Sequence, residues 1–234
     1  MGTTLFVLLR SLDLLLQYEI LTKNLTTPHL DAFIVPRPSS ARASPEEFLG
    51  QSGKSLILLL MAVGSYVKQI YTLLYTANEI MPAYSAMLIS ASQTFFKSTN
   101  SIISLTAATS FLTPGFLLAE TRAGISLLLI LGSVGYVVGI AGEAISETQR
   151  KKFKDDPKNA GKLYTGGSFA YARHINYGSN LVWRVSYAVA SGGWVYGLVS
   201  VVMLAGQFLM MGVPIMDKYC SKRMSLAPHF TFLC

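Results

Sequence analysis

Two acidic side chains four residues apart open the part of the chain whose residue types could do chemistry. Glu143 and Glu147 follow an uncharged apolar run and would share one face of a helix that continues past residue 142. Gln149 comes next, and then a basic stretch that includes Lys152. Carboxylates can bind ribose hydroxyls, and lysine or arginine can hold phosphates. This grouping predicts a site for a nucleotide-like cofactor.

A second polar group follows further along the chain. It contains Asn159, the run Tyr171-Ala-Arg-His-Ile-Asn-Tyr177, and Asn180. Each member also has an ordinary explanation, because basic runs beside a span anchor headgroups and tyrosines are common at membrane interfaces. A lone histidine such as His174 is more often structural than catalytic. The density of these residues in one stretch favours a site.

The composition places this chemistry in a membrane protein. The chain has 234 residues, of which 51% are hydrophobic and only 13% are charged, whereas soluble domains carry about 25% charged residues. The net charge of +7 is more typical of membrane topology and anionic headgroups than of nucleic-acid binding. Cys220 and Cys234 cannot build a disulfide framework or a zinc site. We expect a lipid bilayer as partner, no nucleic acid and no metal.

Apolar runs of about 20 residues predict the transmembrane helices. The uncharged runs 98–119 and 123–142 predict a helical hairpin with a short turn at Glu120 and Arg122. Two further spans are predicted at 55–78, where Lys68 is the single charge, and at 80–96.

Residues 185–216 are too long for one untilted span. We expect two short or broken helices, 181–194 and 196–214, with the break near Gly192, Gly193 and Trp194.

The run from Leu5 to Leu21 carries three charges, Arg10, Asp13 and Glu19. It lacks the basic start and unbroken apolar core of a signal peptide. It predicts a first anchor helix whose charges face other helices. The basic stretch from Arg150 to Arg173 is expected on the cytosolic side.

The polar stretch resembles the C-terminal domain of steroid 5-alpha-reductases and their relatives. Sterol C14-reductases and isoprenylcysteine carboxyl methyltransferases share its Arg-His-x-x-Tyr part. The resemblance covers about residues 120–220, and the residues that carry it are Glu143, Glu147, Gln149, Lys152, Phe153, Asn159, Gly161, Lys162, Gly166 and the run from Tyr171 to Tyr177.

This resemblance implies a membrane enzyme with a cytosol-facing cofactor pocket and a lateral opening for a lipid-like small-molecule substrate. The cofactor is NADPH in the reductases and S-adenosylmethionine in the methyltransferases. By position, the residues that would face the cofactor are Glu143, Glu147, Gln149, Lys152, Asn159, Arg173, His174, Asn176, Tyr177 and Asn180. Tyr177 and His174 are the catalytic candidates, with Tyr177 as a possible proton donor.

The chain departs from the family pattern at Ile175, in the run 178–180, mildly at Glu147, which replaces an aspartate, and in its tail. Ile175 replaces the expected proline, and Asn180 replaces an acidic residue. An amide at 180 can hydrogen-bond a cofactor, but it carries no charge. The tail from 221 to 234 does not match the usual ending.

The sequence therefore predicts an all-α, multi-pass transmembrane bundle of about six to seven helices. Its parts are an anchor helix and linker (1–54), transmembrane helices (55–119), the reductase-like domain (120–220) and the atypical tail (221–234). The leading hypothesis is NADPH-dependent reduction of a C=C bond in a lipid, sterol or terpenoid-like enone, in the endoplasmic reticulum. The alternatives are an S-adenosylmethionine-dependent methyltransferase and a non-catalytic protein that retains the fold. The oligomeric state is left open.

Overall fold

The described part of the chain is a bundle of helices without β-strands. The computed structural model describes residues 2–22, 53–77, 81–105, 125–160, 162, 164–172, 174–212 and 214. Its long helices are α1 (Gly2–Thr22), α2 (Gly53–Tyr71), α3 (Ala83–Ser104), α5 (Leu127–Asp155) and α6 (Ile175–Gln207). Short helical turns follow three of them: η2 (Thr72–Thr76), η4 (Pro157–Asn159), η5 (Gly167–Ala170) and η6 (Phe208–Gly212). The all-α bundle is confirmed, and the count of six to seven helices stays a prediction.

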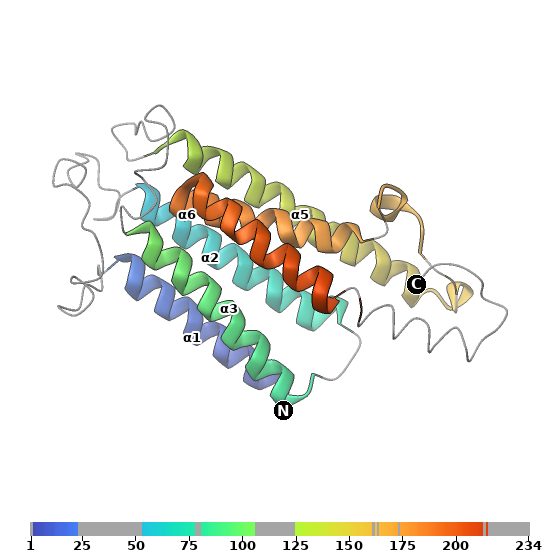
Figure 1. Ribbon diagram of the computed structural model, residues 1–234. Helices are drawn as coiled ribbons and strands as arrows, with labels where there is room; N and C mark the ends of the chain where they lie inside the picture. The colour runs from blue at the N-terminus through green and yellow to red at the C-terminus, as the bar shows by residue number, and fades with distance from the viewer. Residues whose placement is uncertain are drawn as a thin grey trace.

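The long helices run side by side (Figure 1), and α2 contacts both the α1/α3 pair and the α5/α6 pair. The larger hydrophobic core lies where α2, α5 and α6 meet, around Leu58, Tyr136 and Tyr187. A smaller core joins Phe6 of α1 to Leu73 of η2 and Ala86 of α3. The helix predicted over 123–142 does continue past residue 142, which places both acidic side chains on α5.

Close packing of α5 against α6 depends on glycines of α5. A Cβ added at Gly139 would lie 2.5 Å from the backbone nitrogen of Trp183, and one at Gly132 would lie 2.7 Å from the carbonyl oxygen of Ser186. Small residues that face a neighbouring helix let the two helix backbones approach closely, as in many membrane helix pairs. This approach brings the α6 side chains up to the acidic residues of α5.

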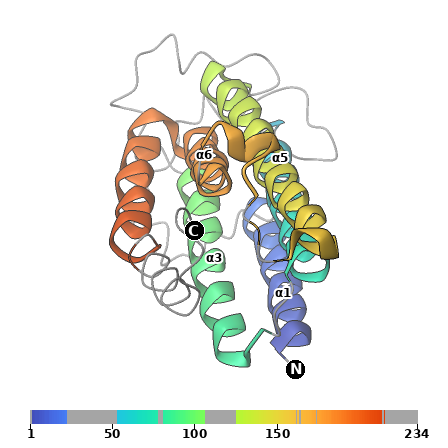
Figure 2. The ribbon, with the colours of Figure 1, turned by 90° about the vertical axis from the view of Figure 1, so that its right-hand side faces the viewer.

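The break predicted near residues 192–194 is confirmed. Gly193 has φ 83° and ψ −177°, a combination that essentially only glycine adopts. The second arm of α6 therefore leaves the direction of the first, and Figures 1 and 2 show it in red turned back beside the orange first arm. The first arm begins at Ile175, so Asn176, Tyr177 and Asn180 belong to a helix and not to the preceding loop.

The predicted break between spans 80–96 and 98–119 is wrong, because α3 runs unbroken from Ala83 to Ser104. Lys97, which separates the two apolar runs, is fully buried and lies 3.3 Å from a carboxylate oxygen of Asp13. A lysine paired inside the bundle need not mark a membrane surface. The predicted turn at residues 120–122 lies outside the described residues.

The prediction that the charges of the first helix face other helices is confirmed for Arg10 and Asp13. Both are buried, and an Nη2 atom of Arg10 lies 2.7 Å from Asp13 Oδ2. Gln17 extends this line of buried polar side chains one turn further and donates to Asp13 and Ser98.

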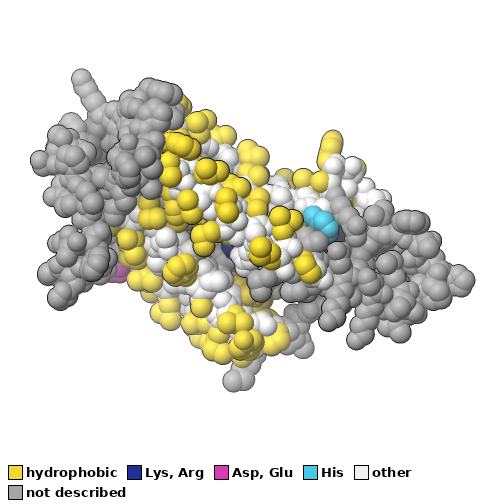
Figure 3. Space-filling model, viewed as in Figure 1, with side chains coloured by type: hydrophobic (Ala, Val, Ile, Leu, Met, Phe, Trp, Pro, Cys, Tyr) yellow, Lys and Arg dark blue, Asp and Glu magenta, His cyan; other side chains and the backbone are white. Residues whose placement is uncertain are grey.

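Three helical segments of the described chain are long and apolar enough to cross a membrane. They are Gly53–Thr76, Leu127–Asp155 and Ile175–Met210. Hydrophobic side chains also cover much of the described surface in Figure 3, and many belong to α5 and the second arm of α6. Exposed apolar helices of this kind are compatible with a lipid bilayer.

Candidate functional site

Glu143 is the most firmly held of the predicted site residues. Its side chain is only 7% exposed and has three partners from two other helices. One carboxylate oxygen accepts hydrogen bonds from Trp183 Nε1 at 2.6 Å, and the other from Asn180 Nδ2 at 3.1 Å. Lys68 Nζ of α2 lies 2.5 Å from that second oxygen. The carboxylate is therefore fixed and compensated by charge.

Glu147 lies one turn further along α5 and shares the same lysine. Its Oε2 lies 3.4 Å from Lys68 Nζ and accepts a hydrogen bond from Thr72 Oγ1 at 2.9 Å. The i,i+4 spacing has thus placed both carboxylates around one ammonium group. Glu147 has fewer hydrogen-bond partners than Glu143, which leaves its carboxylate room for a further hydrogen bond.

These side chains line a cavity of about 220 Å³ between α1, α2, α3, α5 and α6. Glu143, Glu147 and Asn180, three of the predicted site residues, are brought together in its wall. The volume is below the roughly 300–1,000 Å³ typical of a site for a drug-sized ligand. It can therefore enclose a reacting group and its immediate neighbours.

Gln149 and Asn159 make contacts that hold the segment after α5. Gln149 Oε1 accepts from the backbone N–H of Ser168 at 2.9 Å, and Asn159 Nδ2 donates to the carbonyl of Phe153 at 3.1 Å. Gly167 beside Gln149 has φ 54°, a backbone conformation that favours glycine. Both amides fasten the polar segment to the end of α5.

His174 and Tyr177 lie in a stack of three rings at the start of α6. The His174 and Tyr177 ring centroids are 5.5 Å apart, and Tyr177 stacks at 5.5 Å on Phe208 of η6. This stack joins the beginning of the first arm to the end of the second. Asn176 beside it is buried, whereas Lys152 on α5 is exposed.

The cavity lining does not include His174, Asn176 or Tyr177. Arg173 lies outside the described residues. The structure thus divides the predicted set between the cavity, the ring stack and the segment after α5. Their roles toward a cofactor remain predictions.

Sequence reasoning missed Lys68, Thr72 and Trp183 as members of the site. A signal for Lys68 was present, because a single charged residue inside an apolar span needs a partner in the bundle. Trp183 and Thr72 carried no comparable signal, because their contacts with the two carboxylates arise from the packing of α6 and η2 against α5.

The charge of the cavity wall favours one kind of cofactor group over another. Among the described residues that line the cavity, the charged ones are Lys68, Glu143 and Glu147, which gives a formal net charge of −1. A sulfonium or ammonium group fits such a wall, and a phosphate does not. The residues present therefore fit the cationic part of S-adenosylmethionine better than a phosphate-bearing part of NADPH.

Comparison with known proteins identifies the family. A family model described as "Protein of unknown function (DUF1295)" matches residues 83–232, which includes most of the 221–234 tail. That family falls within the steroid 5-alpha-reductase-like and isoprenylcysteine methyltransferase-like superfamily, so the resemblance is confirmed at this level. The chain is 35% identical over 238 residues to "Probable O-methyltransferase ustE" of Ustilaginoidea virens, with 98% of this chain and 81% of that protein covered. No solved structure matches the chain. The chain belongs to the DUF1295 family.

Proposed function

We propose that this chain is a multi-pass membrane enzyme that transfers a methyl group from S-adenosylmethionine to an oxygen atom of a lipid-like small molecule. The observation that carries the proposal is the 35% identity, over 98% of the chain, to a protein named as a probable O-methyltransferase. The negative cavity wall supports it independently, because it favours a cationic cofactor group. This replaces the reductase as the leading hypothesis.

S-adenosylmethionine, when bound, supplies an electrophilic methyl group on a positively charged sulfur. The fixed carboxylate of Glu143 would attract that positive charge, and Asn180 would hold the carboxylate in place. Glu147, with fewer partners, is the better placed of the two to take a proton from the acceptor oxygen. Lys68 would limit the negative charge between them.

NADPH-dependent reduction of a C=C bond is the second candidate. It is favoured by the exposed basic side chains near the end of α5, which could hold phosphates. In that case Tyr177 or His174 would supply the proton, as the resemblance implies.

Cofactor binding separates the candidates. We expect S-adenosylmethionine and S-adenosylhomocysteine to raise the unfolding temperature of the detergent-purified protein, and NADPH to leave it unchanged. Glu143→Gln should weaken the S-adenosylmethionine effect, whereas Lys158→Gln, exposed beyond α5, should not. Stabilisation by NADPH would favour the reductase, and stabilisation by neither cofactor would favour a non-catalytic protein.

We place the enzyme in the endoplasmic reticulum membrane, with the basic stretch 150–173 in the cytosol. The support is the positive-inside tendency together with a lipid-like substrate. Glycosylation acceptor sites inserted into this stretch should stay unmodified in microsomes, and their modification would contradict the orientation.

A further inference from the structure

Two glutamines that the resemblance does not include also line the cavity. Gln69 comes from α2 and Gln93 from α3. Each carries a buried polar atom without a hydrogen-bond partner, Nε2 in Gln69 and Oε1 in Gln93. An unpaired buried polar atom costs free energy unless a partner satisfies it. A cavity with two such side chains in its wall is suited to a polar ligand.

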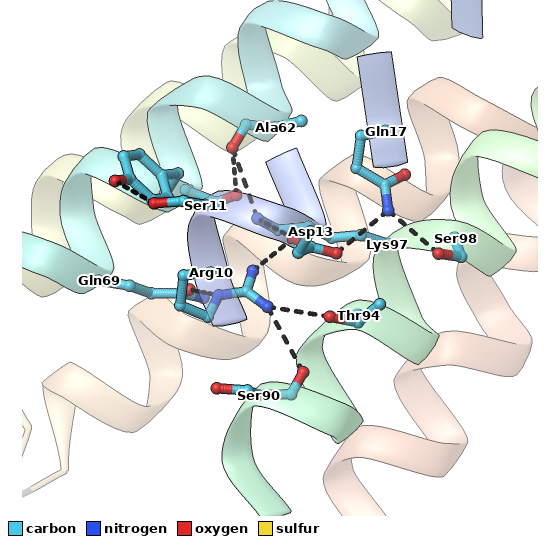
Figure 4. Close-up of polar contacts among 12 residues, drawn as sticks. Arg10, Ser11, Asp13, Gln17, Ala62, Gln69, Ser90, Thr94, Lys97 and Ser98 are labelled. Atoms are coloured by element: carbon cyan, nitrogen blue, oxygen red, sulfur yellow. Dashed lines mark hydrogen bonds and ion pairs between the residues drawn. The ribbon is translucent and has the colours of Figure 1, made fainter. Parts of the chain in front are cut away.

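The orientation of the Gln69 amide is set by Arg10. Arg10 Nε donates to Gln69 Oε1 at 2.8 Å (Figure 4), and because a guanidinium group can only donate, it must meet the amide oxygen. Arg10 is itself held by Asp13 at 2.7 Å and by Thr94 at 3.3 Å. The remaining group of Gln69 is therefore a hydrogen-bond donor, the Nε2 amide.

Gln93 supplies the complementary group. The residue is only 9% exposed, and its unpaired atom is the acceptor Oε1. The cavity wall thus offers one donor and one acceptor from neighbouring helices. Apolar side chains complete this part of the lining, namely Phe6, Leu73, Met81 and Ile89. Ile89 is 41% exposed, so the apolar lining continues to the surface of α3.

We infer that the methyl acceptor is a neutral hydroxyl group on an apolar ring, held in the cavity between Gln69 and Gln93. This inference rests on the proposed methyltransferase function and specifies its substrate class. A hydroxyl group both accepts and donates a hydrogen bond, so it satisfies Gln69 Nε2 and Gln93 Oε1 together. A carboxylate can only accept, and it would leave the oxygen of Gln93 facing another acceptor.

The charge of the cavity also favours a neutral hydroxyl over a carboxylate. A carboxylate would join Glu143 and Glu147 opposite a single lysine, and like charges in a poorly solvated site repel strongly. The acidity of the hydroxyl narrows the class further. A phenol, with a pKa near 10 as in tyrosine, is acidic enough for a carboxylate base to remove its proton during methyl transfer. An aliphatic alcohol is a much weaker acid.

The reaction balances with groups already named. The phenolic oxygen forms a bond to the methyl carbon while the bond from that carbon to the sulfonium sulfur breaks, and its electron pair stays on sulfur as S-adenosylhomocysteine leaves. The phenolic proton, which the bound acceptor shares with Gln93 Oε1, moves to the carboxylate of Glu147 in the same cavity wall as the oxygen attacks, and from there to water. No oxidant or reductant is required.

A matched pair of probes tests the acceptor class. 2-Naphthol carries a neutral hydroxyl, and 2-naphthoate carries a carboxylate on the same ring. The chain has two tryptophans, so in a Trp194→Phe background Trp183 in the cavity wall is the single one, and quenching of its fluorescence reports occupancy. In nanodiscs, we expect 2-naphthol to bind at least about tenfold more tightly than 2-naphthoate, with empty nanodiscs as the partition control.

Variants of the glutamines test the recognition. Gln93→Leu should weaken 2-naphthol binding by roughly tenfold, because one hydrogen bond to a buried group is lost, and Gln69→Leu should do the same. Gln207→Leu is the control, since Gln207 is exposed at the end of α6. Methyl transfer from labelled S-adenosylmethionine to 2-naphthol should fall in parallel, through KM more than kcat.

The binding measurements and the methyl-transfer measurements test different claims. Tight binding of 2-naphthoate, absence of 2-naphthol binding, or insensitivity to both glutamine variants would overturn the inference. Glutamine-dependent binding of 2-naphthol without binding of S-adenosylmethionine would instead overturn the methyltransferase function and keep the hydroxyl site.

Discussion

At the scale of single residues, the site depends on how buried charges compensate one another. Lys68 lies between two carboxylates of α5, and its side chain is only 9% exposed. Taking three charges out of water is costly, and their mutual attraction offsets that cost only when the geometry is close. Trp183 then satisfies the second oxygen of Glu143, and Thr72 donates to the Glu147 oxygen that also lies near Lys68. The result is a fixed polar wall on the α5 side of the cavity.

Removing the lysine should therefore destabilise the whole protein. We expect Lys68→Met to cost about 3–5 kcal/mol of unfolding free energy, because it leaves two carboxylates uncompensated inside the bundle. Unfolding by SDS titration in mixed micelles measures this cost. Lys151→Met removes a partly exposed pair with Asp155 and should cost less than about 1 kcal/mol.

Removing a carboxylate charge as well as the lysine tests whether charge compensation causes this loss of stability. Adding Glu147→Gln to Lys68→Met should recover part of the lost stability, since it removes one of the two unpaired charges. A double variant less stable than Lys68→Met would contradict charge compensation as the cause.

At the scale of helices, glycines of α5 let α5 and α6 pack closely together. The glycines of α5 that face α6 leave no room for a Cβ, and dispersion contacts between the two backbones replace the missing side-chain packing. This approach brings Trp183 and Asn180 within hydrogen-bond distance of Glu143. A wider separation would lose both contacts.

Gly139→Val should push the helices apart. We expect a loss of about 1–3 kcal/mol or more from overpacking, and weaker cofactor binding because Glu143 loses its donors. Gly206→Val is a suitable control, since a Cβ at Gly206 meets nothing within 4 Å. Equal stability of the two variants in the same SDS titration would show that close packing is not required.

The bend at Gly193 is a second feature at this scale. Its φ of 83° is strained for any residue with a Cβ, so Gly193→Ala should cost about 1–3 kcal/mol. Gly206→Ala in the same helix has no such conflict and should stabilise slightly, as alanine does in helices. Thermal unfolding of the two alanine variants, compared with the original chain, measures the difference in sign.

At the scale of the whole molecule, the described helices expose apolar side chains outward and bury many of their charges. Val134, Val137 and Val138 of α5 are each more than half exposed, whereas Arg10 and Lys97 are fully buried. In water this arrangement would be unfavourable, and in lipid it is the expected one, because hydrocarbon solvates apolar side chains and not charges.

A charge on the outer face of α5 should oppose membrane insertion. Val138→Arg, at a position 63% exposed, should cost about 2.5–3.5 kcal/mol in an insertion assay with flanking glycosylation sites in microsomes. Tyr171→Arg, at a position 90% exposed next to η5, should have no effect. If both arginines insert equally well, the outer face of α5 does not contact lipid.

The sequence by itself determined the helical class, the apolar segments, the break near Gly193 and the helical spacing of Glu143 and Glu147. These follow from composition, from periodicity and from the conformational limits of single residue types, all of which are local. Only the tertiary structure decided that Lys97 lies inside one unbroken helix, that Lys68 joins the two carboxylates, and that Gln69 and Gln93 share their cavity. Those contacts join helices far apart in the chain, and the partner of a buried charge depends on how the helices pack.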